Sequence, residues 1–257
     1  MKRLAMLLAL VILAPAHAQE GVQNVIDCMR ANVPPALRAQ EIELVATDRS
    51  GATRSLKGKL YAMLEKTSAG GGLVRAMMRM ESPESVAGAA YLVRETADSP
   101  IQDTFVYLPS FRRVRRINGS LGDGALLGTN FSYNDFKQLA NAFVGSSAKL
   151  EGPGEIDKHP TYVVWFKPLS GGYNSVRTWV DKKTCVPLKA DFRVGETVRK
   201  RLTASPSALQ QSGNYWYLSE VEMRDLLEGT KTVMITGKVT GAEELPGRLF
   251  DPNLFYQ

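Results

Sequence analysis

Few side chains in this 257-residue sequence are of the types that perform acid–base, nucleophilic or metal chemistry. The two histidines, His17 and His159, are too few for a cluster of metal-binding imidazoles. The G-x-S-x-G nucleophile elbow is absent, and Gly122, Gly124 and Gly128 do not have the spacing of a dinucleotide-binding loop. Paired carboxylates, as in glycosidases, stay an open alternative because two acids can come from distant parts of a chain. We predict a protein that is not an enzyme and binds no metal ion or cofactor.

The first 18 residues have the three parts of a cleavable secretory signal. Two basic residues begin the chain, an apolar run follows from Leu4 to Ala14, and Ala16-His17-Ala18 matches a cleavage site. The run is shorter than the roughly 20 helical residues that cross a bilayer, and no cysteine follows to accept a lipid. We expect cleavage after Ala18 and a soluble, unanchored single domain of residues 19–257 outside the cytoplasm.

The most unusual local composition is Arg112-Arg113-Val114-Arg115-Arg116, with four arginines in five residues of a predicted strand. The arginines could protect an exposed strand edge or pair with acids on neighbouring strands. They could also dock an acidic partner or lipid headgroups, so Arg112, Arg113, Arg115 and Arg116 are candidate docking residues. Nucleic acid is the weakest alternative, because an exported protein rarely meets it. Cleavage after Ala18 lowers the net charge from +6 to +4, a bias that suits solubility or transient contact with an anionic membrane.

An amphipathic helix is predicted near the N-terminus and ends before Pro34. Its apolar stripe consists of Val22, Val25, Ile26 and Met29. Cys28 lies beside this stripe, and in an oxidising compartment it can form one disulfide with Cys185. Because this disulfide would close a long loop in the unfolded chain, the chain-entropy model gives a stabilisation of the folded protein by up to about 4–5 kcal/mol. We predict the disulfide; two separately buried thiols are the alternative.

Most of the remaining chain alternates apolar and polar residues, which predicts half-buried strands. Leu56 to Leu64 and Val74 to Met80 are predicted to pair across a turn at residues 68–72. Further strand candidates are residues 86–94, 103–108, 112–117, 148–155, 160–168, 174–181, 186–194, 197–204, 215–226 and 230–240. About 12 short strands in succession predict a mainly β protein built on an antiparallel sheet, which must close, curl or be covered.

One stretch, between Asn118 and Ser147, interrupts the strands. Within it Phe136, Leu139 and Phe143 have helical spacing, with Ser132 or Asn134 as the N-cap. We predict that the concave face of a curved sheet is covered by this helix and the N-terminal one, and that the helix from Phe136 to Phe143 is a lid.

The segment Tyr107–Ile117 and the stretch Phe131–Asp135 resemble the LolA-like outer membrane lipoprotein-sorting proteins of Gram-negative bacteria. Trp179-Val180-Asp181, Pro187–Ala190 and the closing Leu249-Phe250 fit the same pattern. The resemblance implies a half-open antiparallel β-barrel of about 11–13 strands, with an N-terminal helix and an inserted helical lid over a hydrophobic cavity. It also implies a periplasmic carrier of lipid or lipoprotein acyl chains, whose expected partners are an RND-type transporter or an outer-membrane acceptor. An accessory subunit that docks such an exporter through its arginines, and an enzyme that acts on a lipid, are the alternatives.

A cavity for acyl chains requires apolar lining rather than polar chemistry, because each buried methylene contributes about 0.8 kcal/mol. Methionine suits such a cavity, since its thioether side chain is flexible. The candidate ligand-binding residues are Met63, Met78, Met80, Tyr107, Phe131, Tyr133, Phe136, Leu139, Phe143, Trp165 and Trp179. For each of them, ordinary core packing is the equally open alternative.

Overall fold

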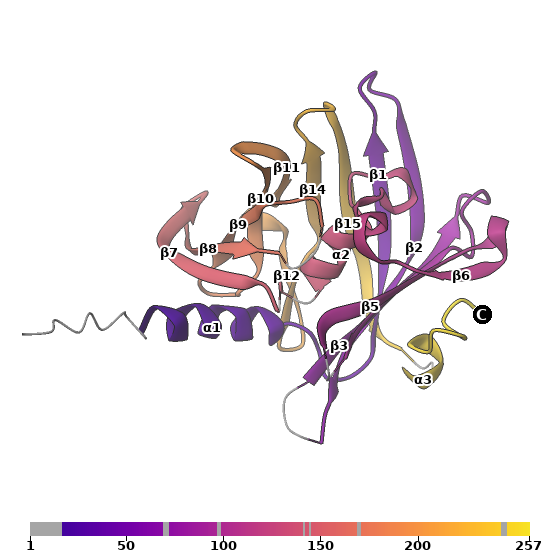
Figure 1. Cartoon of the computed structure of the whole chain (residues 1–257), viewed down its shortest axis with the longest axis horizontal. Coiled ribbons are helices and arrows are strands. Elements are labelled where there is room, and N and C mark those ends of the chain that lie inside the picture. Colours follow the sequence, from indigo (N-terminus) through magenta and orange to yellow (C-terminus); the bar gives the residue numbers. More distant parts are fainter. Residues whose placement is uncertain are drawn as a thin grey trace, which may run out of the picture.

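The structure is a computed structural model that describes residues 17–68, 72–96, 99–140, 142–143, 145–168, 171–242 and 246–257 (Figure 1). The predicted signal segment lies outside the described residues, apart from His17 and Ala18, which begin the first helix. Among the described residues, no helix is long and apolar enough to cross a bilayer.

One antiparallel sheet of 13 strands dominates the fold, in the order β6-β5-β4-β3-β2-β1-β15-β14-β11-β10-β9-β8-β7. Its first strands are β1 (Arg38–Thr47), β2 (Thr53–Lys66), β3 (Gly72–Ser82), β4 (Ala90–Thr96), β5 (Ser99–Leu108) and β6 (Arg113–Arg116). Its later strands are β7 (Ser147–Ile156), β8 (His159–Lys167), β9 (Ser175–Asp181), β10 (Pro187–Val194), β11 (Thr197–Thr203), β14 (Glu220–Asp225) and β15 (Thr230–Gly241). A separate hairpin joins β12 (Leu209–Ser212) to β13 (Tyr215–Leu218).

The predicted mainly β fold and antiparallel sheet are confirmed, with local differences. Residues 86–89 form a turn before β4, the expected strand 215–226 divides into β13 and β14, and β12 was not predicted. The edge strands β6 and β7 do not pair with each other among the described residues, so the sheet is curved but is not a closed barrel (Figure 1).

Helix α1 (His17–Arg30) packs its predicted apolar stripe into the core of the sheet. Val22, Val25, Ile26 and Met29 are all buried. The predicted disulfide is confirmed: Cys28 is bonded to Cys185, with a Cα–Cα separation of 5.7 Å. It fastens α1 to the turn between β9 and β10, beside the hydrogen bond that Asn32 Nδ2 donates to the Thr184 carbonyl.

Helix α2 (Tyr133–Ala140) occupies the predicted insertion, and Ser132 is its N-cap. Ser132 Oγ accepts a hydrogen bond from the Asp135 N–H, and Asp135 Oδ2 accepts one from the Ser132 N–H. The expectation that the helix reaches Phe143 is wrong, because the chain leaves the helix after Ala140. Phe143 adopts a left-handed backbone conformation with φ of 58°. Three short 3₁₀ turns precede α2, at Pro109–Phe111, Gly119–Asp123 and Leu126–Gly128.

Strand β3 is buried on both faces, so two separate cores lie against the sheet. On the concave face Ala76 and Met78 join a large core that includes α1 and α2 residues. On the outer face Met77 joins a smaller core covered by the C-terminal segment, residues 246–257, which contains the short helix α3 (Pro246–Leu249). This division decides which apolar residues face a cavity.

Candidate functional site

An apolar cavity of about 220 Å³ lies on the concave face, between strands β1, β2, β3 and β15 and the segment that contains α2. The sheet contributes Gln40, Leu60, Ala62, Val74, Ala76 and Met234, and the chain after α1 contributes Asn32, Val33 and Pro34. Phe131, Phe136 and Leu139 close the opposite side. Three of the predicted ligand-binding residues therefore line one cavity, and its walls are suited to hydrocarbon rather than to a charged group.

Polar contacts hold the N-terminal end of α2 against the sheet. The fully buried Asp135 carboxylate pairs with Lys200 of β11, with 3.2 Å between Oδ2 and Nζ. Lys200 also donates to the Asn130 carbonyl, and the Tyr173 hydroxyl lies 3.4 Å from Asp135 Oδ2. Burial and the neighbouring Asp135 carboxylate raise the pKa of Tyr173 far above its ordinary value, so this phenol is neutral. Leu139, by contrast, lies in the last turn of α2, beyond these contacts.

Tyr91 of β4 contacts the first turn of α2 from the sheet side. Its ring packs against the rings of Tyr133 and Phe136, with centroid separations of 5.1 and 5.5 Å. Its hydroxyl donates a 2.7 Å hydrogen bond to the Tyr133 carbonyl, and burial raises its pKa well above the ordinary value. A void of about 10 Å³ lies beside Tyr91, lined in part by Met78 and Met80.

The other predicted ligand-binding residues lie away from the cavity. Phe143 is buried in the core and stacks on Phe166 at 4.6 Å. Met63 and Tyr107 contribute to the core on the outer face, where Tyr107 stacks on Tyr256 at 4.1 Å.

Trp165 and Trp179 also lie on the outer face, because their strand neighbours Val164 and Val180 fill the concave core. Lys189 covers the Trp179 ring, with Nζ 4.2 Å from the centroid. The alternation of residues along a strand could not show which face the C-terminal segment would cover.

The arginine segment forms the edge strand β6 and the residue before it. Arg112, Arg113 and Arg115 are exposed, and no hydrogen bond or salt bridge of their side chains occurs in the described part of the chain. Arg116 differs, because it forms a salt bridge with Asp103 of β5. Phe111 and Leu121 on either side of the strand are 57% and 61% exposed, which is unusual for large apolar side chains.

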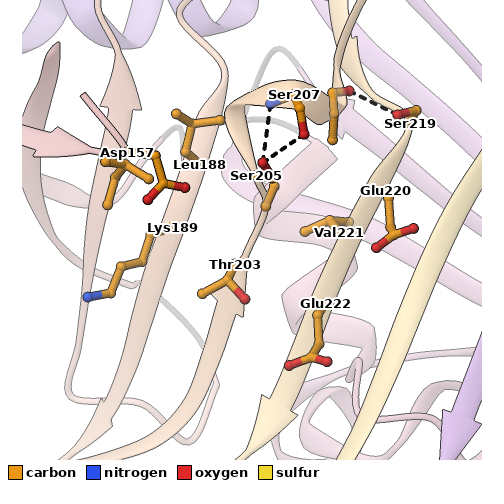
Figure 2. Close-up of a pocket in the computed structure, with 13 residues that line it drawn as sticks. Asp157, Leu188, Lys189, Thr203, Ser205, Ser207, Ser219, Glu220, Val221 and Glu222 are labelled. Atoms are coloured by element: carbon orange, nitrogen blue, oxygen red, sulfur yellow. Dashed lines mark hydrogen bonds between the residues drawn. The ribbon is translucent and has the colours of Figure 1, made fainter. Parts of the chain in front are cut away.

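A second cavity, of about 580 Å³, opens where β11 leaves the sheet toward the β12–β13 hairpin (Figure 2). Its walls are mixed, with Leu188 and Val221 beside Lys189, Glu220 and Glu222. No sequence pattern pointed to this cavity, because its residues come from four separate segments without a shared motif. Within the described ranges no three side chains of His, Cys, Asp or Glu are grouped to hold a metal ion.

Residues 72–255 match a family model that is described as "Uncharacterized protein". The chain belongs to this family. No curated protein matches the sequence. The matched region runs from β3 to the C-terminal segment and includes β6 and α2. It also contains every lining residue of the second cavity and those of the apolar cavity from Val74 onward.

Solved structures have a similar fold over about nine tenths of this chain. A DUF1329 family protein from Desulfovibrio piger superimposes with a TM-score of 0.79 at 20% identity, over 90% of this chain and 96% of its own. A putative outer membrane lipoprotein-sorting protein domain from Vibrio parahaemolyticus gives 0.78 at 19% identity, over 91% and 97%. A LolA superfamily protein from Nitrosomonas europaea gives 0.67 at 18% identity, over 89% and 96%. The predicted resemblance to LolA-like proteins is therefore confirmed in the fold.

Proposed function

We propose that this protein is a periplasmic carrier that holds a lipid or lipoprotein acyl chains in its concave cavity and shuttles them between the inner and outer membranes. The observation that carries the proposal is the apolar cavity of about 220 Å³ enclosed by Phe131, Phe136 and Leu139. A protein named for lipoprotein sorting has a similar fold, which supports this choice of cargo. Export by the N-terminal signal would place the carrier in the periplasm.

We further propose that α2 is a lid. The cavity is smaller than the roughly 300–1,000 Å³ of typical ligand pockets, so a long acyl chain needs additional space. Phe136 and Leu139 occupy that space and are apolar, so cargo can replace their contacts with the sheet. The Asp135–Lys200 pair anchors the first turn of α2, so Leu139 in the last turn moves first when the cavity opens and Phe136 follows by a change of its side chain.

The test compares two phenylalanines that the structure assigns to different roles. Phe136→Ala removes a cavity wall and should increase the release of bound lipid, whereas Phe143→Ala removes core packing and should mainly lower stability. Lipids extracted from each purified variant are quantified by mass spectrometry, and stability is measured by urea unfolding. Equal lipid content in Phe136→Ala and the wild type would argue against a carrier with this lid.

A second candidate function is that of an accessory subunit docked to an RND-type exporter. It is favoured by the exposed and unpaired side chains of Arg112, Arg113 and Arg115. Arg113→Glu with Arg115→Glu should abolish capture of such an exporter while lipid content stays unchanged. Loss of lipid without loss of capture would reject this candidate.

A further inference from the structure

A continuous row of paired residues crosses the concave face from the cavity to the arginine strand. Each member is the direct register partner of the next on the neighbouring strand. The row consists of Gln40, Leu60, Met78, Tyr91, Val106 and Arg115. Directly paired residues of an antiparallel sheet share a face, so Arg115 lies on the same face as the cavity. Four strand spacings separate Leu60 from Arg115, or about 19 Å along the sheet.

The middle of this row is apolar and covered, whereas its end is charged and open. Met78, Tyr91 and Val106 are each at most 4% exposed, beneath the segment from Leu126 to Leu139. Small voids persist under this cover: the cavity beside Leu60 and the space of about 10 Å³ that touches Met78, Tyr91 and Val106. The cover therefore lies over an apolar path along this row in which two separate voids remain, the second of them on the strand next to β6.

Two arginines are placed at the end of that path. Arg115 pairs with Val106 and Arg113 pairs with Leu108, and both of these partners pack on the concave core. Arg113 and Arg115, two residues apart on one strand, therefore point to the same face. Arg116 belongs to the opposite face, where it pairs in register with Phe105 of the outer core. An isolated pair of cations on the cavity side matches one anionic group, since guanidinium forms strong bonds to phosphate or carboxylate oxygens.

We infer that Arg113 and Arg115 bind the anionic headgroup of the cargo, while its acyl chain follows the covered row from β5 to the cavity at β2. This inference rests on the proposed carrier function and specifies its substrate class, an anionic amphiphile. It assigns headgroup binding to only two of the four arginines. If the segment instead docked on an exporter or a membrane surface, arginines on both faces of β6 would contribute to binding.

The test uses two lysolipids with the same palmitoyl chain, lysophosphatidylglycerol and lysophosphatidylcholine, below their micellar concentrations. Binding is measured by displacement of the apolar fluorophore N-phenylnaphthylamine and by calorimetry at low salt. The wild type should bind the anionic lysolipid about tenfold more tightly than the zwitterionic one. Arg113→Gln with Arg115→Gln should abolish this preference and leave fluorophore binding unchanged. Added salt should weaken the preference, because the arginines are exposed.

Arg115→Gln alone removes one charge on the cavity side and should weaken the preference. Arg116→Gln is its matched control, since it removes one charge from the same strand on the opposite face. It should keep the tenfold preference. Equal binding of the two lysolipids by the wild type, or an equal loss in Arg116→Gln and the double variant, would overturn the inference. Arginine-dependent sedimentation with phosphatidylglycerol vesicles, without a lysolipid preference, would also overturn it in favour of surface docking. Failure of the fluorophore and both lysolipids to bind would instead reject the carrier function.

Discussion

The two faces of strands β2 to β5 both carry large apolar side chains, yet their covers differ. On the outer face the C-terminal segment inserts Leu249 and Phe255, which are fully buried. Arg79 fixes that segment with hydrogen bonds to the carbonyls of Phe255 and Gln257. On the concave face the cover is α2 with the loop before it, and a cavity of about 220 Å³ remains beneath Phe136.

The difference shows that apolar density alone does not identify a binding surface. Met77 and Met78 are neighbours in sequence and equally buried, but one touches the C-terminal segment and the other the concave core. What distinguishes the faces is the space left beneath the cover. Both covers are held by hydrogen bonds to their backbone carbonyls, from Arg79 on the outer face and from Tyr91 and Lys200 on the concave face, but the concave cover leaves the cavity beneath Phe136.

The largest expected effect comes from breaking the outer cover. Phe255→Ala should lower the free energy of unfolding by about 3–5 kcal/mol, because it leaves a cavity in a filled core. Urea unfolding measures the loss, and lipid content per folded molecule should not change. Leu254→Ala is the control, since that neighbouring side chain is 38% exposed and should cost far less. If Phe255→Ala lowered the lipid content per folded molecule while Leu254→Ala did not, both faces of the sheet would take part in binding.

Removing the disulfide tests how firmly the concave side is assembled. Cys28→Ser with Cys185→Ser should lower the free energy of unfolding by about 2–4 kcal/mol, the typical range for a disulfide and below the chain-entropy limit of about 4–5 kcal/mol, because the unfolded chain loses the closure of a long loop. The measurement is urea unfolding of the variant beside the oxidised wild type. Reduction of the wild type with dithiothreitol should reproduce the loss, and an unchanged midpoint would contradict it.

Filling space should have opposite consequences on the two faces. Ala76→Leu extends into the concave cavity, so stability should stay the same or rise by about 1 kcal/mol while N-phenylnaphthylamine binding falls. Ala90→Leu overfills the outer core and should cost about 1–3 kcal/mol. Thermal unfolding and fluorophore titration of both variants measure these effects. Destabilisation by Ala76→Leu as large as that by Ala90→Leu would show that the two faces are equally tightly packed.

The smallest expected effect is on the stability at low pH, and it concerns Asp181 in the turn that carries Cys185. Burial raises the pKa of Asp181, but hydrogen bonds from the Thr184 hydroxyl and N–H and from His159 outweigh it and bring the pKa below its ordinary value. The stabilising contribution of this carboxylate is therefore present above the unfolded-state pKa of about 4 and is lost as the pH falls through the lower folded-state pKa.

Asp181→Asn should accordingly cost about 1 kcal/mol at neutral pH and show a weaker dependence on pH below about 4. Urea unfolding at a series of pH values gives both quantities. An identical acid dependence in the wild type and Asp181→Asn would contradict this assignment.

Much of the fold could be predicted because it depends on local patterns. Alternation along β2 and β3 placed Leu60 and Met78 on one face, and the spacing of Val22 and Met29 defined the buried stripe of α1. The split between β13 and β14, the β12 hairpin and the end of α2 before Phe143 were missed. These features depend on contacts with distant strands, such as the stacking of Phe143 on Phe166.

The amino-acid sequence by itself determined the strand-rich composition, the two amphipathic helices, the cysteine pair and the unusual charge of β6. Only the tertiary structure decided that Phe131, Phe136 and Leu139 share a cavity while Tyr107 and Trp179 lie on the other face. The physical reason is that period two separates the faces of a strand without showing what covers each face. That depends on segments far away in the chain, here α2 on one side and the C-terminal residues on the other.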